Sequence, residues 1–117
     1  MSKALTRAIV IGTILQLAMV LIGHSVPAVA RMFAPLGMSI SLVAGLSYGL
    51  WAGAVSKGQS ARDGAIAGGL CALIGIAVSC ALGDVSAIIL LAGTLSSTVT
   101  GVIGAFIARA LPAARTA

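Results

Sequence analysis

The sequence predicts an all-α integral membrane protein: a single domain, residues 1–117, of four transmembrane helices packed through stripes of small residues. Two observations lead to this fold class. The chain is 60% hydrophobic and only 8% charged, whereas soluble domains carry about 25% charged residues. Its charges separate four apolar runs, each of about 18–24 residues and so long enough to cross a hydrocarbon core of roughly 30 Å.

The first apolar run covers residues 8–26 and contains two polar side chains, Gln16 and His24. Pro27 is expected to end this helix or to kink its last turn. A second interpretation stays open for this region. A basic start, an apolar run and an Ala-Val-Ala tripeptide at residues 28–30 are also typical of a cleaved secretory signal. We favour a retained helix, because the run is long enough to span.

The second run, residues 36–55, shows the clearest small-residue pattern, and Pro35 is well placed at its start. Every fourth residue is small, at Gly37, Ser41, Gly45, Gly49 and Gly53. In a soluble helix each glycine costs roughly 1 kcal/mol relative to alanine. In a bilayer this spacing instead lets a second helix backbone approach closely. The pattern therefore predicts a glycine-zipper type of helix contact.

The third and fourth runs cover residues 65–82 and 85–108. Residues 56–64 are the most polar stretch of the chain and are expected to form a loop. Gly83 and Asp84 predict a tight turn, with Asp84 capping the fourth helix. The small-residue spacing recurs at Gly75 and Ser79 and at Gly93, Ser97 and Gly101.

An internal repeat is a further possibility. Shifting the second run by 56 residues places its Gly37, Ser41 and Gly45 on the small residues of the fourth run. The chain would then be a tandem repeat of one helical hairpin, with both copies starting on the same side of the membrane. Chance matches are common in a chain so rich in Gly, Ala and Val, so both interpretations stay open.

The charge distribution predicts the topology. One side of the four-span arrangement carries six cations, Lys3, Arg7, Lys57, Arg62, Arg109 and Arg115, and the other carries Arg31 and Asp84. The positive-inside bias therefore places both termini in the cytoplasm, with the chain in the plasma (inner) membrane. The net charge of +5 does not indicate nucleic acid binding, because the cations lie singly or in pairs at segment ends. The expected partner is the lipid bilayer.

The residue inventory argues against an enzyme. The chain has one histidine, two acidic residues and no glutamate, so neither paired carboxylates nor a Ser-His-Asp set can be assembled. We expect no cofactor and no metal site. Cys71 and Cys80 fall on opposite faces of one helix, roughly 13 Å apart along its axis, so they are not expected to form a disulfide.

Six polar side chains are candidates for a polar pathway through the membrane: Gln16, His24, Asp84, Ser96, Thr98 and Thr100. Each also has a structural interpretation. A buried amide such as Gln16 often joins two helices. Membrane hydroxyls often bond the carbonyl four residues earlier. His24, Asp84 and Arg31 are expected on one side, where they could form a charged cluster or act as ordinary interfacial groups.

Two functions are compatible with these features. The first is a small transport or channel-type protein that acts as a homo-oligomer, because four short helices leave little room for an enclosed pathway. The second is a non-catalytic accessory or assembly subunit of a larger membrane complex, favoured by the expected absence of a deeply buried charge. The sequence gives neither the substrate nor the partner.

Overall fold

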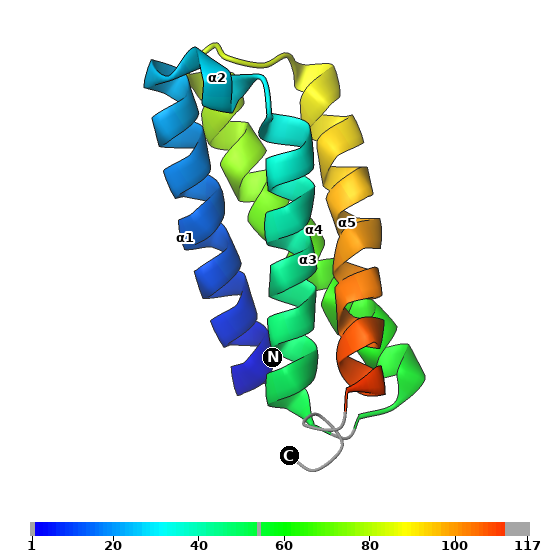
Figure 1. Ribbon diagram of the computed structural model, residues 1–117. Coiled ribbons are helices and arrows are strands. Elements are labelled where there is room, and N and C mark those ends of the chain that lie inside the picture. The colour runs from blue at the N-terminus through cyan, green and yellow to red at the C-terminus, as the bar shows by residue number, and fades with distance from the viewer. Residues whose placement is uncertain (1, 54, 112–117) are drawn as a thin grey trace.

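The computed structural model describes residues 2–53 and 55–111. This part of the chain contains helices α1 (Lys3–Ser25), α2 (Pro27–Ala30), α3 (Phe33–Ala52), α4 (Lys57–Ala81) and α5 (Ala87–Ala110), and no strand (Figure 1). Within these residues, α1, α3, α4 and α5 are each long and apolar enough to span a membrane. The prediction of an all-helical chain with four such helices is confirmed.

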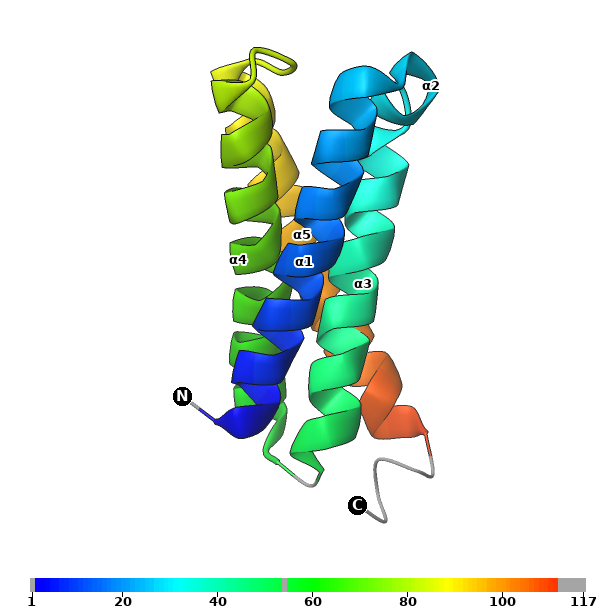
Figure 2. The same ribbon diagram turned by 90° about the vertical axis from the view of Figure 1, so that its left-hand side faces the viewer.

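The four long helices form an elongated bundle of 43 × 21 × 21 Å. We call α1 and α3, which α2 connects, the first helix pair, and α4 and α5 the second helix pair. α1 and α5 lie at opposite corners, and α3 contacts α4 between them. Figure 2 shows the two helix pairs separating toward the end that carries α2 and the α4–α5 turn.

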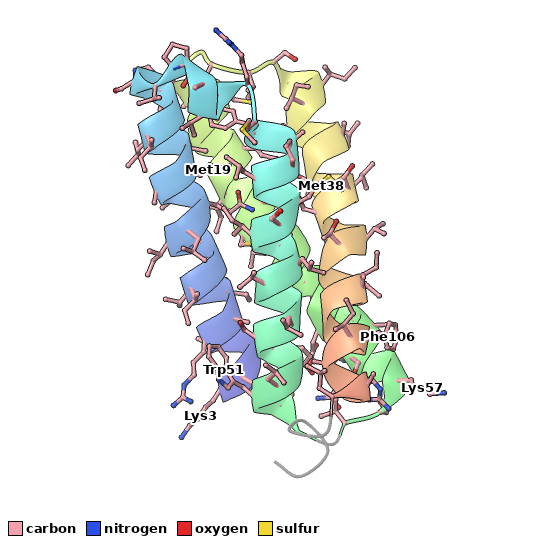
Figure 3. The ribbon with its side chains drawn as sticks, in the orientation of Figure 1. Lys3, Met19, Met38, Trp51, Lys57 and Phe106 are labelled. Carbon is pink, nitrogen blue, oxygen red and sulfur yellow. The ribbon has the colours of Figure 1, made fainter. Side chains whose placement is uncertain are left out.

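The two ends of the bundle differ in charge. α1 begins and α5 ends at one end, which also carries Lys3 and Lys57 (Figure 3). We call this the basic end, and the opposite end, with α2 and the α4–α5 turn, the turn end. Arg115, which we counted with the basic side, lies outside the described residues.

The helices approach most closely around Gly101 of α5, in the half of the bundle toward the basic end. A Cβ atom on Gly45 of α3 would lie 2.8 Å from the carbonyl carbon of Gly101. A Cβ atom on Gly101 would lie 2.8 Å from the Cα of Gly68 on α4. Neither position has room for a side chain. The same half holds a core of small and aliphatic side chains around Tyr48.

The helix boundaries of α1, α3 and α5 lie within a few residues of the predicted ones, and α1 ends just before Pro27 as expected. The predicted polar loop at residues 56–64 is wrong, because α4 already begins at Lys57. Ser56 is its N-cap, and the Ser56 hydroxyl accepts a hydrogen bond from the backbone N–H of Gln59 at 3.1 Å. The polar stretch is therefore the first part of a helix.

Two further details differ from prediction. Gly53 ends α3 with a φ of 70°, so it is the residue that terminates the helix and not part of its small-residue face. Gly83 adopts a φ of 80°, and the Asp84 N–H donates to the Ser79 carbonyl at 3.0 Å. This arrangement closes α4 and confirms the tight turn. Asp84 does not cap α5, because Ser86 occupies the N-cap position.

The contact at Gly101 can be tested by adding one methyl group. Gly45→Ala places a Cβ against the backbone of Gly101, and we expect it to lower the free energy of unfolding by about 1–3 kcal/mol. The matched control is Gly58→Ala, because a Cβ at Gly58 meets nothing within 4 Å. It should raise the unfolding free energy by up to about 1 kcal/mol. Unfolding in mixed micelles followed by circular dichroism measures both. Equal effects of the two substitutions would show that the backbones are not in contact.

Candidate functional site

A cavity of about 220 Å³ lies between the two helix pairs, in the half of the bundle toward the turn end. All four long helices contribute to its lining. Met19 of α1 and Met38 of α3 both line it, and Figure 3 marks their positions. We call this space the interhelical cavity. It forms because the helix pairs diverge here, while they are in close contact in the other half.

The interhelical cavity opens sideways between α3 and α5. Its exposed lining residues all belong to these two helices: Ala34, Met38, Ile89, Ala92 and Ser96. The lining residues from α1 and α4 are buried or half-buried. The opening is therefore on the side of the bundle, between two helices that are apolar enough to face lipid. None of the described residues that line the cavity carries a charge.

Gln16 lies at the inner end of the cavity, close to the middle of α1, and is 1% exposed. Its side-chain amide donates to the Gly37 carbonyl at 3.1 Å and to the Ser41 hydroxyl at 3.4 Å. The Ser41 hydroxyl in turn donates to the carbonyl of Gly68 at 3.2 Å. This chain of hydrogen bonds joins α1, α3 and α4. The expected interhelical partner of the buried amide is therefore present.

Ser79 of α4 and Ser97 of α5 are both buried hydroxyls of the cavity wall. Ser79 is 2% exposed, and its oxygen has no hydrogen-bond partner in the described part of the chain. Two other buried hydroxyls there share this property, on Thr13 and Thr94, but neither lines the cavity. Buried polar groups in proteins usually have a hydrogen-bond partner. A molecule in the cavity could supply that partner, because the Ser79 hydroxyl can donate or accept a hydrogen bond.

The hydroxyl groups of α5 divide into two sets. Ser96 and Ser97 line the cavity. Thr98 and Thr100 instead donate to carbonyls of their own helix four residues earlier, at 2.7 and 2.8 Å. The reason is the helical period, since successive side chains point about 100° apart. The candidate pathway residues on α5 therefore do not form one polar line.

His24 and Asp84 meet at the turn end, where the imidazole Nδ1 lies 2.9 and 3.1 Å from the two carboxylate oxygens. His24 belongs to the first helix pair and Asp84 to the turn of the second. We call this contact the turn-end tie. Its side chains are partly exposed, at 47% and 23%. Arg31 makes no ion pair with either of them among the described residues, so the expected three-residue cluster is a pair.

A second polar contact joins the helix pairs near the basic end. The Tyr48 hydroxyl of α3 donates to one carboxylate oxygen of Asp63 on α4 at 2.8 Å. The Arg62 Nε donates to the other oxygen at 3.1 Å. Tyr48 is 0% and Asp63 3% exposed. We call the Tyr48–Asp63 contact the basic-end tie.

The polar character of residues 56–64 predicts a loop around Asp63, whereas the structure places this residue in α4, where it is 3% exposed. The informative signal was Ser56 followed by Gln59, since Ser-x-x-Gln is typical of a helix N-terminus. A helix that starts at Lys57 brings Asp63 to the face that packs on α3. Nearby, Arg109 of α5 donates to the Ser60 hydroxyl at 3.0 Å and to the Val55 carbonyl.

The cavity has a mostly apolar wall with a few polar side chains. The described residues contain no group of three or more potential metal ligands, and no nucleophile with an adjacent base lines the cavity. Cys71 and Cys80 are free thiols, as predicted. No family model, no curated protein and no solved structure matches this chain.

The basic-end tie predicts an energetic coupling between two helices. Tyr48→Phe and Asp63→Asn should each destabilise the bundle, and the double variant should lose less than the sum. We expect a coupling energy of about 1 kcal/mol or more, because the hydrogen bond is made to a charged group. Unfolding in mixed micelles measures it. Tyr48→Phe combined with Ser39→Ala is the control, because Ser39 bonds only its own helix. If the changes in unfolding free energy of Tyr48→Phe and Asp63→Asn add up to that of the double variant within about 0.3 kcal/mol, the basic-end tie contributes no measurable stability.

Proposed function

We propose that the chain is an integral protein of the plasma membrane with its basic end in the cytoplasm. The four apolar helices support insertion. The orientation rests on charge: Lys3, Arg7, Lys57, Arg62 and Arg109 belong to segments at the basic end, against Arg31 at the turn end. Cytoplasmic flanks are enriched in Lys and Arg. In this orientation the interhelical cavity lies in the outer half of the membrane.

We further propose that the protein is a small transport protein whose binding site is the interhelical cavity. The observation that carries this proposal is the asymmetry of the bundle. A cavity reaches from one side to the buried amide of Gln16, while the other half is closed by contacts at Gly101 and Tyr48. A binding space that is blocked on one side is typical of a carrier. A channel needs a continuous path, and the polar side chains here lie at separate levels.

The two helix pairs are the natural moving parts. Both pairs start at the basic end, as a parallel tandem repeat would require. Many carriers alternate access by moving one repeat against the other around a central site. The small-residue stripes would ease this movement, because they form a smooth interface without interlocking side chains. Among the described residues, a polar contact joins the two pairs at each end, the turn-end tie and the basic-end tie.

Self-association remains a proposal, since the cavity is formed within one copy. Exposed apolar side chains on α5, at Ile88, Leu91, Leu95 and Val99, offer a surface to lipid or to a second copy. The alternative function, an accessory subunit of a larger membrane complex, predicts a rigid bundle. The two functions therefore differ in whether the helix pairs move relative to each other.

Distance measurements between spin labels test this movement in lipid nanodiscs, in a background without the native cysteines. Labels at Leu21 and Ile88 report on the turn end, and labels at Trp51 and Phe106 report on the basic end. All four side chains are exposed. When Tyr48→Phe weakens the basic-end tie, we expect the basic-end distance to lengthen in part of the molecules and the turn-end distance to shorten.

Ser39→Ala is the matched control, because it removes an exposed hydroxyl that bonds within α3, and it should leave both distances unchanged. A single distance distribution at each end, identical in Tyr48→Phe and in the parent protein, would contradict the carrier proposal and support a rigid subunit.

A further inference from the structure

We infer that the interhelical cavity takes a small, uncharged molecule that is dissolved in the bilayer and carries a hydrogen-bond acceptor, and that this molecule enters between α3 and α5. The inference rests on the proposed function in one respect, the role of the cavity as the substrate site. It adds the chemical class of the substrate and its route, which follow from the charge, size, polar groups and opening of the cavity.

The lining excludes a charged ligand. Within the described part of the chain, none of the residues that form the cavity is ionisable. The nearest acids are already engaged, Asp84 with His24 at the turn end and Asp63 with Tyr48 and Arg62 on the far side of the closed half. An ion in the cavity would lose its hydration without gaining a counter-charge, which is strongly unfavourable in an apolar surrounding.

The volume limits the ligand to a small molecule. An apolar cavity of about 150 Å³ is large enough to bind benzene, and this cavity measures about 220 Å³. It therefore fits an aromatic ring with a short substituent. Most of its wall is aliphatic, from residues such as Val20, Ala72 and Ile76. These side chains favour an apolar body for the ligand.

The polar groups of the wall favour a ligand that accepts a hydrogen bond. The side-chain amide of Gln16 has two N–H donors, and both are used, by the Gly37 carbonyl and the Ser41 hydroxyl. The Ser79 hydroxyl is buried and has no partner among the described residues. The Ser96 and Ser97 hydroxyls also line the cavity, so the wall offers hydroxyl donors, and a carbonyl or ether oxygen is the simplest group to accept from them.

The opening indicates a route from the bilayer. The rim is formed by exposed apolar residues of α3 and α5, among them Met38 at 42% and Ile89 at 46%. In the proposed orientation this rim faces lipid. A lipid acyl chain is the competing occupant, but its methyl end would leave the Ser79 hydroxyl without a partner. A free lipophilic molecule with an acceptor satisfies both the apolar wall and this hydroxyl.

Acetophenone provides a direct probe, because it is a neutral ketone with one ring and a short substituent, and its excited state reacts with neighbouring C–H groups under near-ultraviolet light. The full chain in lipid nanodiscs is irradiated with acetophenone, and the adducts are located by mass spectrometry. We expect adducts on cavity residues, above all Met19 and Met38. The anionic analogue 4-acetylbenzoate should label these positions about tenfold less, because burying its carboxylate is unfavourable. An excess of anisole, which has one ring and an ether oxygen, should compete with acetophenone.

Two substitutions with matched controls connect the labelling to the cavity. Ala72→Leu fills the cavity and should reduce the adducts about tenfold or more, whereas Ala77→Leu, on the exposed face of the same helix, should not. If Ala72→Leu does not fold, Ala92→Phe at the exposed rim serves instead, with Leu91→Phe as its control.

The hydrogen bond needs its own variant. Ser79→Ala should weaken labelling about fivefold by removing the donor, and Ser39→Ala should leave it unchanged. Adducts spread over outward-facing residues such as Leu95, with no effect of Ala72→Leu, would overturn the inference. Labelling that is blocked by Ala72→Leu but independent of Ser79 would also overturn it, since an acyl chain would then fit as well.

The outcomes separate this inference from the proposed transport function. If the cavity is labelled specifically but the spin-label distances never change, the result supports the inferred ligand class and contradicts the transport function. If the helix pairs move but no specific labelling occurs, the result supports transport and contradicts the inferred ligand class.

Discussion

The close approach of α5 to α3 and α4 at Gly101 is the contact on which the rest of the molecule depends. Three helix backbones meet there with no side chain between them, which only glycine allows. Because the helices touch in this half, and because α2 and the α4–α5 turn hold the helices in pairs at the other end, the pairs must diverge. The cavity results from this divergence and from small residues in its wall, among them Gly37, Ala72 and Gly93.

Polar side chains then stabilise a geometry that packing alone has set. Hydrogen bonds between membrane helices contribute on average about 0.6 kcal/mol, so no single one holds the bundle. The Gln16–Ser41–Gly68 chain joins three helices at the centre. The two acidic residues of the chain, Asp63 and Asp84, each join the two helix pairs at one end. Weak contacts of this kind suit a protein whose parts move.

Much of the fold follows from local patterns, whereas the site does not. The apolar runs, Pro27 and Gly83 place the long helices and their turns, because each acts within a few residues. The position of Asp63 depends on where α4 begins. The helix begins within a polar stretch that is also typical of a loop, so the apolar pattern does not show its first residue. The cavity depends on the angle between helix pairs, which no local pattern encodes. For the same reason the six candidate polar residues separate into different levels: only Gln16 and Ser96 of that set line the cavity.

Solid-state NMR on protein labelled with ¹³C only at glycine Cα, in lipid bilayers, tests the central contact most directly. The chain has only 15 glycines, so its spectrum can be assigned. Cross-peaks from Gly101 to Gly45 and to Gly68 are expected, because these backbones touch. No cross-peak should link Gly37 and Gly93, which face the cavity from different helix pairs. A spectrum without the Gly101 cross-peaks, or with a Gly37–Gly93 cross-peak, would contradict a bundle that is closed in one half and open in the other.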